Sequence, residues 1–508
     1  MRSHTTAPER RMSRVDTAWL RMDNRVNLMM IVGVWLLSPA VTLAALRARL
    51  ATRLMQYPRF GQCAVVDALG AAWVDDSRFD LACHVVAEPL AIDTGQSERA
   101  ALQQLCGVLA ATPLDPGRPL WQFHLVEQYE GGCALIARIH HCIGDGMALI
   151  SVMNSLTDGG QNPPQWPGAH DAQDAHDAQP AGPAAPQARY SGDWLAQAVL
   201  TPLTGLAVKA LQASGQGLAG ALGSLQGLIR PRPRPQSGIG IALAGLKVAG
   251  DVASDLAALA LMADDSPTRL KGKPNGQKVV AWGEPLPLDA VKAVGQALGC
   301  SINDVLLSCV SGAIGSHLRD LGDDTAGQEI RAMVPVNLRP LDKAWQLGNR
   351  FGLAPLLLPI GIANPVQRVV AIKARMARLK GSFQPLLAFG VLAVSGLMAK
   401  PVQDAVLGLF SKKTTAVMTN VPGPKVPLKF CGATLRQMMF WVPASGDVGM
   451  GVSILSYGGG VQFGLITDAA LCPDPQTIID RFEPEFEQLL WLALMLPWGS
   501  DPGAPTVS

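Results

Sequence analysis

Cys133-Ala-Leu-Ile-Ala-Arg-Ile139, followed at once by His140-His141-Cys142-Ile143-Gly144-Asp145-Gly146, is the most informative stretch of this chain. The apolar run predicts a buried strand, and a helical pattern begins near Met147. Two histidines therefore lie where a strand ends, and an aspartate follows the second histidine by four residues. A histidine held in one orientation at a strand end is suited to act as a general base. The glycines allow a sharp turn and the close approach of a substrate.

Length and composition limit the classes of protein to consider. A chain of 508 residues is too long to fold around a single hydrophobic core, so we expect two or three domains. Hydrophobic residues make up 48% of the sequence, and the net charge of +2 gives no electrostatic case for nucleic-acid binding. The nine cysteines are scattered without a CxxC pair, which indicates reduced thiols in a cytoplasmic protein that is not secreted. No apolar run of about 18 residues predicts a membrane span.

Changes in composition divide the chain. We expect, in order, a disordered N-terminus (1–12), an N-terminal domain (13–160), a disordered linker (161–190), a helical insert (191–270), a C-terminal domain (271–498) and a disordered tail (499–508). The insert allows two interpretations. It packs as a helical hairpin on its own domain, or it lies on a lipid surface with Arg230, Arg232 and Arg234 near anionic headgroups.

Hydrophobic periodicity and turn residues predict the elements of both domains. Helices are expected at 40–55, 98–111, 288–298 and 486–498, and another from a capping box at Ser301-Ile-Asn-Asp304 to about residue 321. Strands are expected at 28–37, 120–128, 134–139, 331–338, 353–359 and 414–420, with a hairpin at 453–467 around Tyr457-Gly-Gly-Gly460.

The histidine pair has several explanations when the residues are taken alone. A lone histidine is most often a satisfied core or surface group. A metal site would need a third ligand, and His124 on a strand is weak support for one. No nucleophile elbow of the G-x-S-x-G type occurs. Cys142 beside the pair is a possible nucleophile, but adjacent residues of an extended segment point in opposite directions, so we expect this thiol to face the core.

The spacing His140-His141-x-x-x-Asp145-Gly146 resembles the HHxxxDG motif of the CoA-dependent acyltransferase superfamily. Further motifs resemble those of one of its branches, the bacterial wax ester synthase/diacylglycerol acyltransferases. These are Val15-Asp16-Thr-Ala-Trp-Leu20, Pro119-Leu120-Trp121, Asn303-Asp304, Pro335-Val-Asn-Leu-Arg-Pro340, Leu347-Gly-Asn-Arg-Phe351 and Thr419-Asn-Val-Pro-Gly-Pro424. Each motif alone is weak, and their order along 13–160 and 270–480 makes the resemblance specific.

The resemblance implies an α/β (α+β) fold of two chloramphenicol-acetyltransferase-like domains. Each would be a mixed sheet flanked by helices, with an active-site tunnel at the domain interface. It implies transfer of a long-chain acyl group from acyl-CoA to a fatty alcohol and/or diacylglycerol, forming wax esters and/or triacylglycerol. Acyl-CoA would be a co-substrate, with no permanently bound cofactor and no metal. The protein would be cytoplasmic, with peripheral contact to the inner membrane or lipid droplets as an open alternative.

The resemblance also assigns roles to residues of the histidine motif. His141 would be the general base. Asp145 would orient the motif as a structural clamp by pairing with an arginine, for which Arg339 is the first candidate and Arg350 the second. Gly146 would have a backbone role, through either a positive φ or close approach of the substrate.

Other candidates keep two interpretations each. His140 either lines the substrate or is a packed residue. Asn303 either donates to the developing oxyanion or only begins a helix, and Asp304 suits the first turn of that helix although its motif places it near substrate. Pro119, Leu120 and Trp121 would line the acyl channel, but an aromatic core explains Trp121 equally well. Lys271, Lys273, Lys412 and Lys413 are the basic candidates for the CoA phosphates.

Two rival functions remain open at this point. The first is a condensation-type acyltransferase that uses a carrier-protein thioester or a specialised alcohol. The second is a catalytically silent lipid-surface protein of the same fold. This alternative is disfavoured because the motif residues His141, Asp145 and Asn303 are all present.

Overall fold

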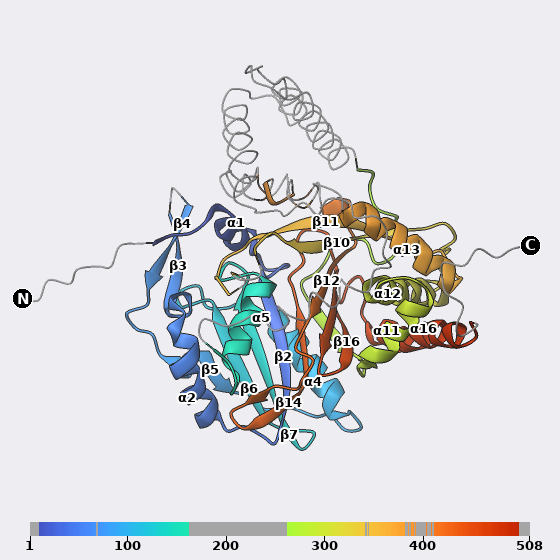
Figure 1. The fold of residues 1–508 in the computed structure, drawn as a ribbon. Helices are drawn as coiled ribbons and strands as arrows, with labels where there is room; N and C mark the ends of the chain where they lie inside the picture. Colours follow the sequence, from blue (N-terminus) through green and yellow to red (C-terminus); the bar gives the residue numbers. More distant parts are fainter. Residues whose placement is uncertain are drawn as a thin grey trace, which may run out of the picture.

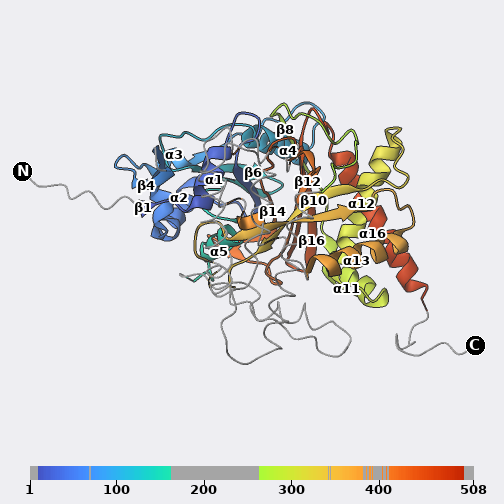
Figure 2. The same cartoon turned by 90° about the horizontal axis from the view of Figure 1, so that it is seen from above.

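Two sheets lie side by side, and most helices cover their outer surfaces (Figures 1 and 2). The computed structural model describes residues 10–67, 70–161, 262–340, 343, 345–380 and 411–496, with scattered positions between 385 and 408. Nearly all of the predicted linker 161–190, most of the predicted insert 191–270 and the tail 499–508 lie outside the described residues.

The first sheet has six strands in the order β13-β14-β2-β7-β6-β5. At its centre is β7 (Gly132–His140), whose nine residues are all buried. Burial on both faces explains why its sequence is a continuous apolar run rather than an alternating pattern. The other strands are β2 (Met30–Ser38), β5 (Val85–Ala87), β6 (Trp121–Tyr129), β13 (Lys429–Phe430) and β14 (Ala433–Trp441).

The second sheet is mixed, and its order is β11-β10-β12-β15-β16-β8, with β9 also paired to β16. Strands β10, β12 and β15 run parallel, and the remaining pairs are antiparallel. Its strands are β8 (Lys278–Trp282), β9 (Leu286–Pro287), β10 (Ile330–Asn337), β11 (Phe351–Leu358), β12 (Ala416–Pro422), β15 (Met450–Tyr457) and β16 (Gly460–Asp468).

Four helices form a layer on one face of the second sheet (Figure 1). They are α11 (Leu288–Ala297), α12 (Ile302–Asp320), α13 (Pro365–Lys380) and α16 (Gln476–Leu494). Apolar side chains from these helices and from the sheet make one core. Among the described helices, none alone is long and apolar enough to cross a membrane, and α11 and α12 reach that length only as a pair bent by 99°.

The remaining elements surround the first sheet. A small sheet, in the order β1-β4-β3, lies beyond it. The elements are β1 (Arg10–Arg11), β3 (Gln62–Asp67), β4 (Gly70–Asp75), α1 (Arg14–Met22), α2 (Leu43–Arg53), α3 (Leu81–His84), α4 (Glu98–Ala110), α5 (Gly146–Ser155) and the short 3-10 helices η1 (Leu54–Gln56) and η2 (Pro58–Gly61).

The two halves of the chain are interlocked. Strand β14, from the C-terminal half, pairs antiparallel with β2 and so completes the first sheet. In the other direction, α4 packs on the edge strand β8, where a Cβ on Gly107 would lie 2.5 Å from the carbonyl oxygen of Lys278. The sequence analysis did not predict this exchange, because no local pattern tells a strand which sheet it will join.

Most predicted elements agree with the structure to within a few residues. The capping box is present, since Ser301 and Asp304 each accept a hydrogen bond from the backbone of the other. The glycine hairpin is also present, with Gly458 and Gly459 at φ 58° and 86°. The final helix, predicted at 486–498, instead spans Gln476–Leu494. Its first half was missed because Pro484 lies inside it, whereas packing against the core overrides this proline.

Candidate active site

The histidine motif follows β7 and is anchored on both sides. The backbone N–H of His140 donates to the carbonyl of Leu120 at 2.9 Å, and that of His141 donates to Met29 at 2.7 Å. Asp145 then begins α5 as its N-cap, with its Oδ1 accepting from the N–H of Ala148 at 2.9 Å. The motif is therefore a tight connection between a central strand and a helix.

His141 lies in an aromatic environment. Its ring stacks on Trp19, with the ring centroids 4.1 Å apart and the planes at 14°, and Phe351 packs against it at 5.5 Å. The residue is only 3% exposed. Burial lowers the pKa of His141 to about 3, because the surroundings solvate an imidazolium poorly. The side chain is therefore a neutral imidazole with a lone pair at neutral pH.

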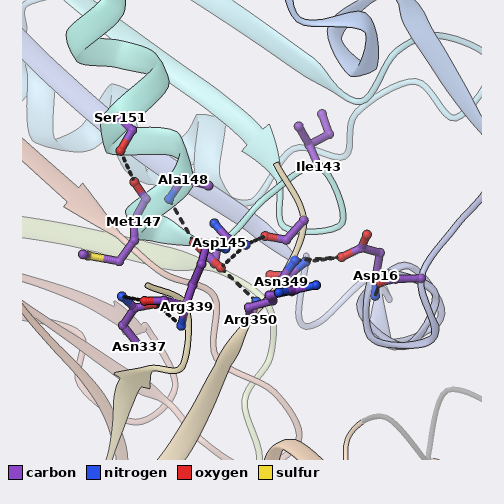
Figure 3. Close-up of polar contacts among 12 residues, drawn as sticks. Asp16, Ile143, Asp145, Met147, Ala148, Ser151, Asn337, Arg339, Asn349 and Arg350 are labelled. Carbon is purple, nitrogen blue, oxygen red and sulfur yellow. Dashed lines mark hydrogen bonds and ion pairs between the residues drawn. The ribbon is translucent and has the colours of Figure 1, made fainter. Parts of the chain in front are cut away.

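Asn349 contacts Asp16, near the start of the chain (Figure 3), and also the backbone of His141. Its Nδ2 donates to the carbonyl of His141 at 2.8 Å and to Asp16 Oδ1 at 2.9 Å. Asp16 also accepts from the Asn349 backbone N–H at 3.0 Å, and its Oδ2 lies 3.3 Å from Arg59. Arg59 in turn donates to the carbonyl of Ile143 at 2.7 Å. Side chains far apart in sequence thus fix the backbone on both sides of Cys142.

Asp145 faces three donors (Figure 3). Besides the cap bond from Ala148, its Oδ2 accepts from Arg339 Nη2 at 3.2 Å and from the Arg350 backbone N–H at 3.0 Å. Both expected arginines therefore contact Asp145, but Arg339 does so through its side chain and Arg350 through its backbone. Burial raises the pKa of Asp145, while the Arg339 guanidinium opposes that rise.

A glycine allows the motif and the 347–351 loop to approach closely. Gly144 and Gly348 form a parallel bridge, and Gly348 has φ 110°, a conformation that side-chain-bearing residues rarely adopt. Its carbonyl also accepts from Arg339 at 2.8 Å. Gly146 has no positive φ, so that part of the expectation is wrong. A Cβ there would meet only Phe440, at an ordinary 3.8 Å.

His140 is buried, and its hydrogen bonding favours one tautomer. Its Nδ1 accepts from the N–H of Cys142 at 3.1 Å, so the ring proton of the neutral form is on Nε2, which lies 3.6 Å from Asp23. Cys142 is fully buried, and burial raises the pKa of its thiol well above the usual value. Such a thiol is a poor nucleophile. The described residues contain no cluster able to hold a metal, and His124 pairs with Glu88.

The other predicted residues lie in different surroundings. Asn303 is exposed, and its Oδ1 accepts from Asn420 Nδ2 at 2.9 Å, but no described contact joins it to His141. Asp304 is taken up by the capping box. Trp121 is 1% exposed, donates to the carbonyl of Phe60 at 2.7 Å and stacks on His84. This favours its interpretation as a core aromatic.

Pro119 and Leu120 are buried beside Trp121, where Leu120 supplies the carbonyl that anchors His140. Two of the four basic candidates for the CoA phosphates are already engaged. Lys271 donates to the carbonyls of Ser411 and Thr414, and Lys413 donates to that of Met262. Only Lys273 and Lys412 are exposed.

An apolar cavity of about 50 Å³ lies on the α5 side of the first sheet. It begins beside Gly146, at the end of the histidine motif. Strands β2, β7 and β14 form its floor, and Leu149, Ile150 and Met153 of α5 cover it. Its lining is almost wholly hydrocarbon, so it suits an alkyl chain rather than a polar group.

Comparison with known proteins decides the family. The model of the wax ester synthase/diacylglycerol acyltransferase catalytic domain matches residues 12–306, and the C-terminal domain model of the same family matches residues 347–490. The chain belongs to this family. The family comprises acyl-CoA-dependent O-acyltransferases, and the resemblance seen in the sequence is confirmed.

Curated relatives of this wax ester synthase/diacylglycerol acyltransferase family member match most of its length, and solved structures share its fold. The probable diacylglycerol O-acyltransferase tgs1 of Mycobacterium tuberculosis is 25% identical over 477 residues, covering 92% of each chain. The wax ester synthase/diacylglycerol acyltransferase of Marinobacter aquaeolei superposes with a TM-score of 0.60 at 19% identity, over 96% of this chain and 100% of that one. The first condensation domain of the CDA synthetase gives 0.52 at 14% identity, over 96% and 97%. The expected fold class is thus confirmed.

The sequence analysis missed the residues that hold His141. Trp19, Asp16 and Asn349 lie in two stretches, 15–20 and 347–351, that contributed to the family resemblance. That resemblance marked the stretches without saying that they meet. Arg59 lies in none of the motifs and had no signal in the sequence.

Proposed function

We propose that this chain transfers a long-chain acyl group from acyl-CoA to a fatty alcohol and/or diacylglycerol, with His141 as the general base. The observation that carries the proposal is a neutral, buried imidazole that is held in place by ring stacking and by fixed backbone on both sides. Such a group can accept a proton without first losing one to solvent.

The chemistry follows from what an alcohol and a thioester require. The imidazole takes the hydroxyl proton while the alcohol oxygen bonds to the thioester carbonyl carbon. The carbon–sulfur bond then breaks, and the imidazolium returns the proton to the leaving CoA thiolate. The ester and free CoA balance the reaction. No covalent enzyme intermediate is needed, because the thioester is already activated.

Burial affects both charges that form during this reaction. Because the site disfavours an isolated imidazolium, proton transfer is coupled to formation of the oxyanion, and the two opposite charges stabilise each other strongly at low dielectric. We assign Asn303 as a donor to the oxyanion. Its bond from Asn420 occupies the side-chain oxygen and leaves the Asn303 amide N–H groups able to donate.

Asp145 and Arg339 act as positioning residues in this proposal. Their pairing joins the motif to the residues after β10, and Asp145 also caps the helix that follows. The apolar lining beside Gly146 supports an acyl donor with an alkyl group, because an alkyl chain is the ligand that a hydrocarbon lining binds.

The test is a product analysis with purified protein. Palmitoyl-CoA is offered together with hexadecanol and with a diacylglycerol, and esters are identified by mass spectrometry. We expect wax ester, triacylglycerol or both, and their loss in His141→Ala. The matched control is His84→Ala, since His84 is also a buried histidine stacked on a tryptophan but lies outside the motif.

The outcomes separate the rival functions. Equal activity of His141→Ala and the wild type would refute the assigned base. Turnover of acyl-carrier-protein thioesters but not acyl-CoA would favour the condensation-type alternative. Liposome binding without any acyl transfer would favour a silent lipid-surface protein.

A further inference from the structure

A row of side chains crosses the first sheet on the face opposite the apolar cavity. Arg138 on β7 pairs with Val32 on β2 and with Gln122 on β6, and Val32 pairs in turn with Trp441 on β14. Residues opposite one another in a sheet project from the same face, whereas neighbours along a strand alternate. The adjacent residues of β7, Ala137 and Ile139, line the cavity, so Arg138 projects from the other face.

Arg138 is a buried cation without a hydrogen-bond partner. It is 2% exposed, yet no hydrogen bond or ion pair joins its guanidinium to any described residue, and its Nε is completely buried. Among the described residues, Glu88 is the only opposite charge that influences it, and the Glu88 carboxylate accepts a hydrogen bond from His124. Burial lowers the pKa of Arg138 to about 10, so the group is still charged at neutral pH.

Other buried nitrogens around the row also lack partners within the described structure. They are the indole N–H groups of Trp441 and Trp282. Trp282 comes from β8 of the second sheet, and its ring lies 5.9 Å from that of Trp441. An unmatched buried polar group is expensive, and native proteins have few of them. The Arg138 guanidinium and both indole N–H groups are donors, so the groups that would satisfy them are oxygen acceptors, which a ligand can supply.

The position of Arg138 narrows the choice of ligand. It lies three residues before His141, roughly 10 Å along an extended chain. The acyl-CoA donor has two amide carbonyls in its pantetheine arm, which fall within that reach of the thioester, whereas its phosphates lie farther away. A guanidinium offers five N–H donors in a fixed planar arrangement, which suits carbonyl oxygens.

We propose that Arg138 binds the pantetheine arm of the acyl-CoA donor through its amide carbonyls. Together with the proposed function, on which this inference rests, it gives the two faces of one sheet separate tasks. The cavity face receives the alkyl chain, and the opposite face receives the pantetheine arm at the end that carries Arg138. His141, at the end of the strand between them, meets the thioester.

Equilibrium binding tests the inference without requiring turnover. Three non-reactive thioethers with the same decyl chain are titrated into wild type and Arg138→Met: decyl-CoA, decyl-pantetheine, and decyl ethyl sulfide, which has no amide. We expect the dissociation constants of the first two to rise by about tenfold or more, and equally, because each loses hydrogen bonds to a charged group. The constant for decyl ethyl sulfide is expected to stay unchanged. Arg138→Lys should give an intermediate loss, since it keeps the charge with fewer donors.

Thermal unfolding of the same variants provides a second measurement. Because Arg138 has no hydrogen-bond partner to lose among the described residues, Arg138→Met should unfold at the wild-type temperature or above it. A clear drop in unfolding temperature would instead indicate a structural role and overturn the inference. Weakening confined to decyl-CoA, equal weakening of all three ligands, or no weakening would also overturn it. A wild type that binds decyl-CoA but transfers no acyl group would refute only the proposed function.

Discussion

Asp145→Asn removes one charge from a buried pair while preserving most of the side-chain shape. The Arg339 side chain is 2% exposed and that of Asp145 is 5% exposed, so water cannot replace the lost carboxylate. Asparagine still caps helices well, so the bond from Ala148 to the cap oxygen is retained. The single amide oxygen caps α5, and the amide N–H groups that take the place of Oδ2 cannot accept hydrogen bonds. The bonds from the Arg339 side chain and from the Arg350 backbone N–H are therefore lost.

The expected loss in free energy of unfolding is about 3–5 kcal/mol, the usual effect of leaving one partner of a buried ion pair uncompensated. Asp145→Ala should cost about 1 kcal/mol more, because it also removes the helix cap. Adding Arg339→Met to Asp145→Asn removes the guanidinium that has lost its carboxylate and should recover part of the loss. The double-mutant cycle should therefore give a coupling of about 1–3 kcal/mol.

The assay is urea unfolding, combined with the rate of ester formation per folded molecule. The control is Asp80→Asn, since Asp80 also caps a helix, α3, through an oxygen but is exposed. Its effect should stay within about 0.5 kcal/mol. We expect Asp145→Asn to reduce the rate as well, because the pair fixes the loop that carries His141. An Asp145→Asn variant as stable and as active as the wild type would refute the clamp.

Four further results are expected. The kcat/KM of the wild type should show no acid limb near pH 6.5, because the depressed pKa keeps His141 neutral until the pH falls far below that value; a midpoint at about 6.5 would contradict this. Cys142→Ala should keep its kcat, and loss of ester formation in the folded variant would restore the thiol as a candidate nucleophile. Asn349→Ala should lower kcat more than it changes KM, since it frees His141 from Asp16; an effect on KM alone would contradict positioning. Asn303→Ala should lower kcat by about 10²-fold, and an unchanged kcat would leave the oxyanion to a backbone N–H.

The sequence predicts correctly those elements that depend on residues close together in the chain. The continuous apolar run of β7, the capping box at Ser301 and the hairpin glycines all express short-range constraints, and each element is present in the structure. Hence the sequence could also predict that the histidine pair ends a strand and that a helix begins after it. The first half of α16 was not predicted, because Pro484 locally disfavours a helix and only core packing makes the helix form there.

The contacts that make the site are long-range. Asn349 lies 333 residues from Asp16 and 208 from His141, and no periodicity connects positions so far apart. The same applies to β14, because nothing in its own sequence specifies which sheet it joins. Arg59 shows the limit most plainly, because it supports the motif from a 3-10 helix with no recognisable signal of its own.

The amino-acid sequence by itself determined the strand, the turn and the helix cap around His141, and its motifs indicated the family. Only the tertiary structure decided that Arg339 meets Asp145 through its side chain while Arg350 does so through its backbone. It also decided that His141 is a neutral, desolvated base and that Arg138 is a buried cation without a hydrogen-bond partner within the described structure. The physical reason is that strands, turns and helix caps form through interactions between residues close in sequence. Burial and electrostatic environment depend instead on how distant segments pack together.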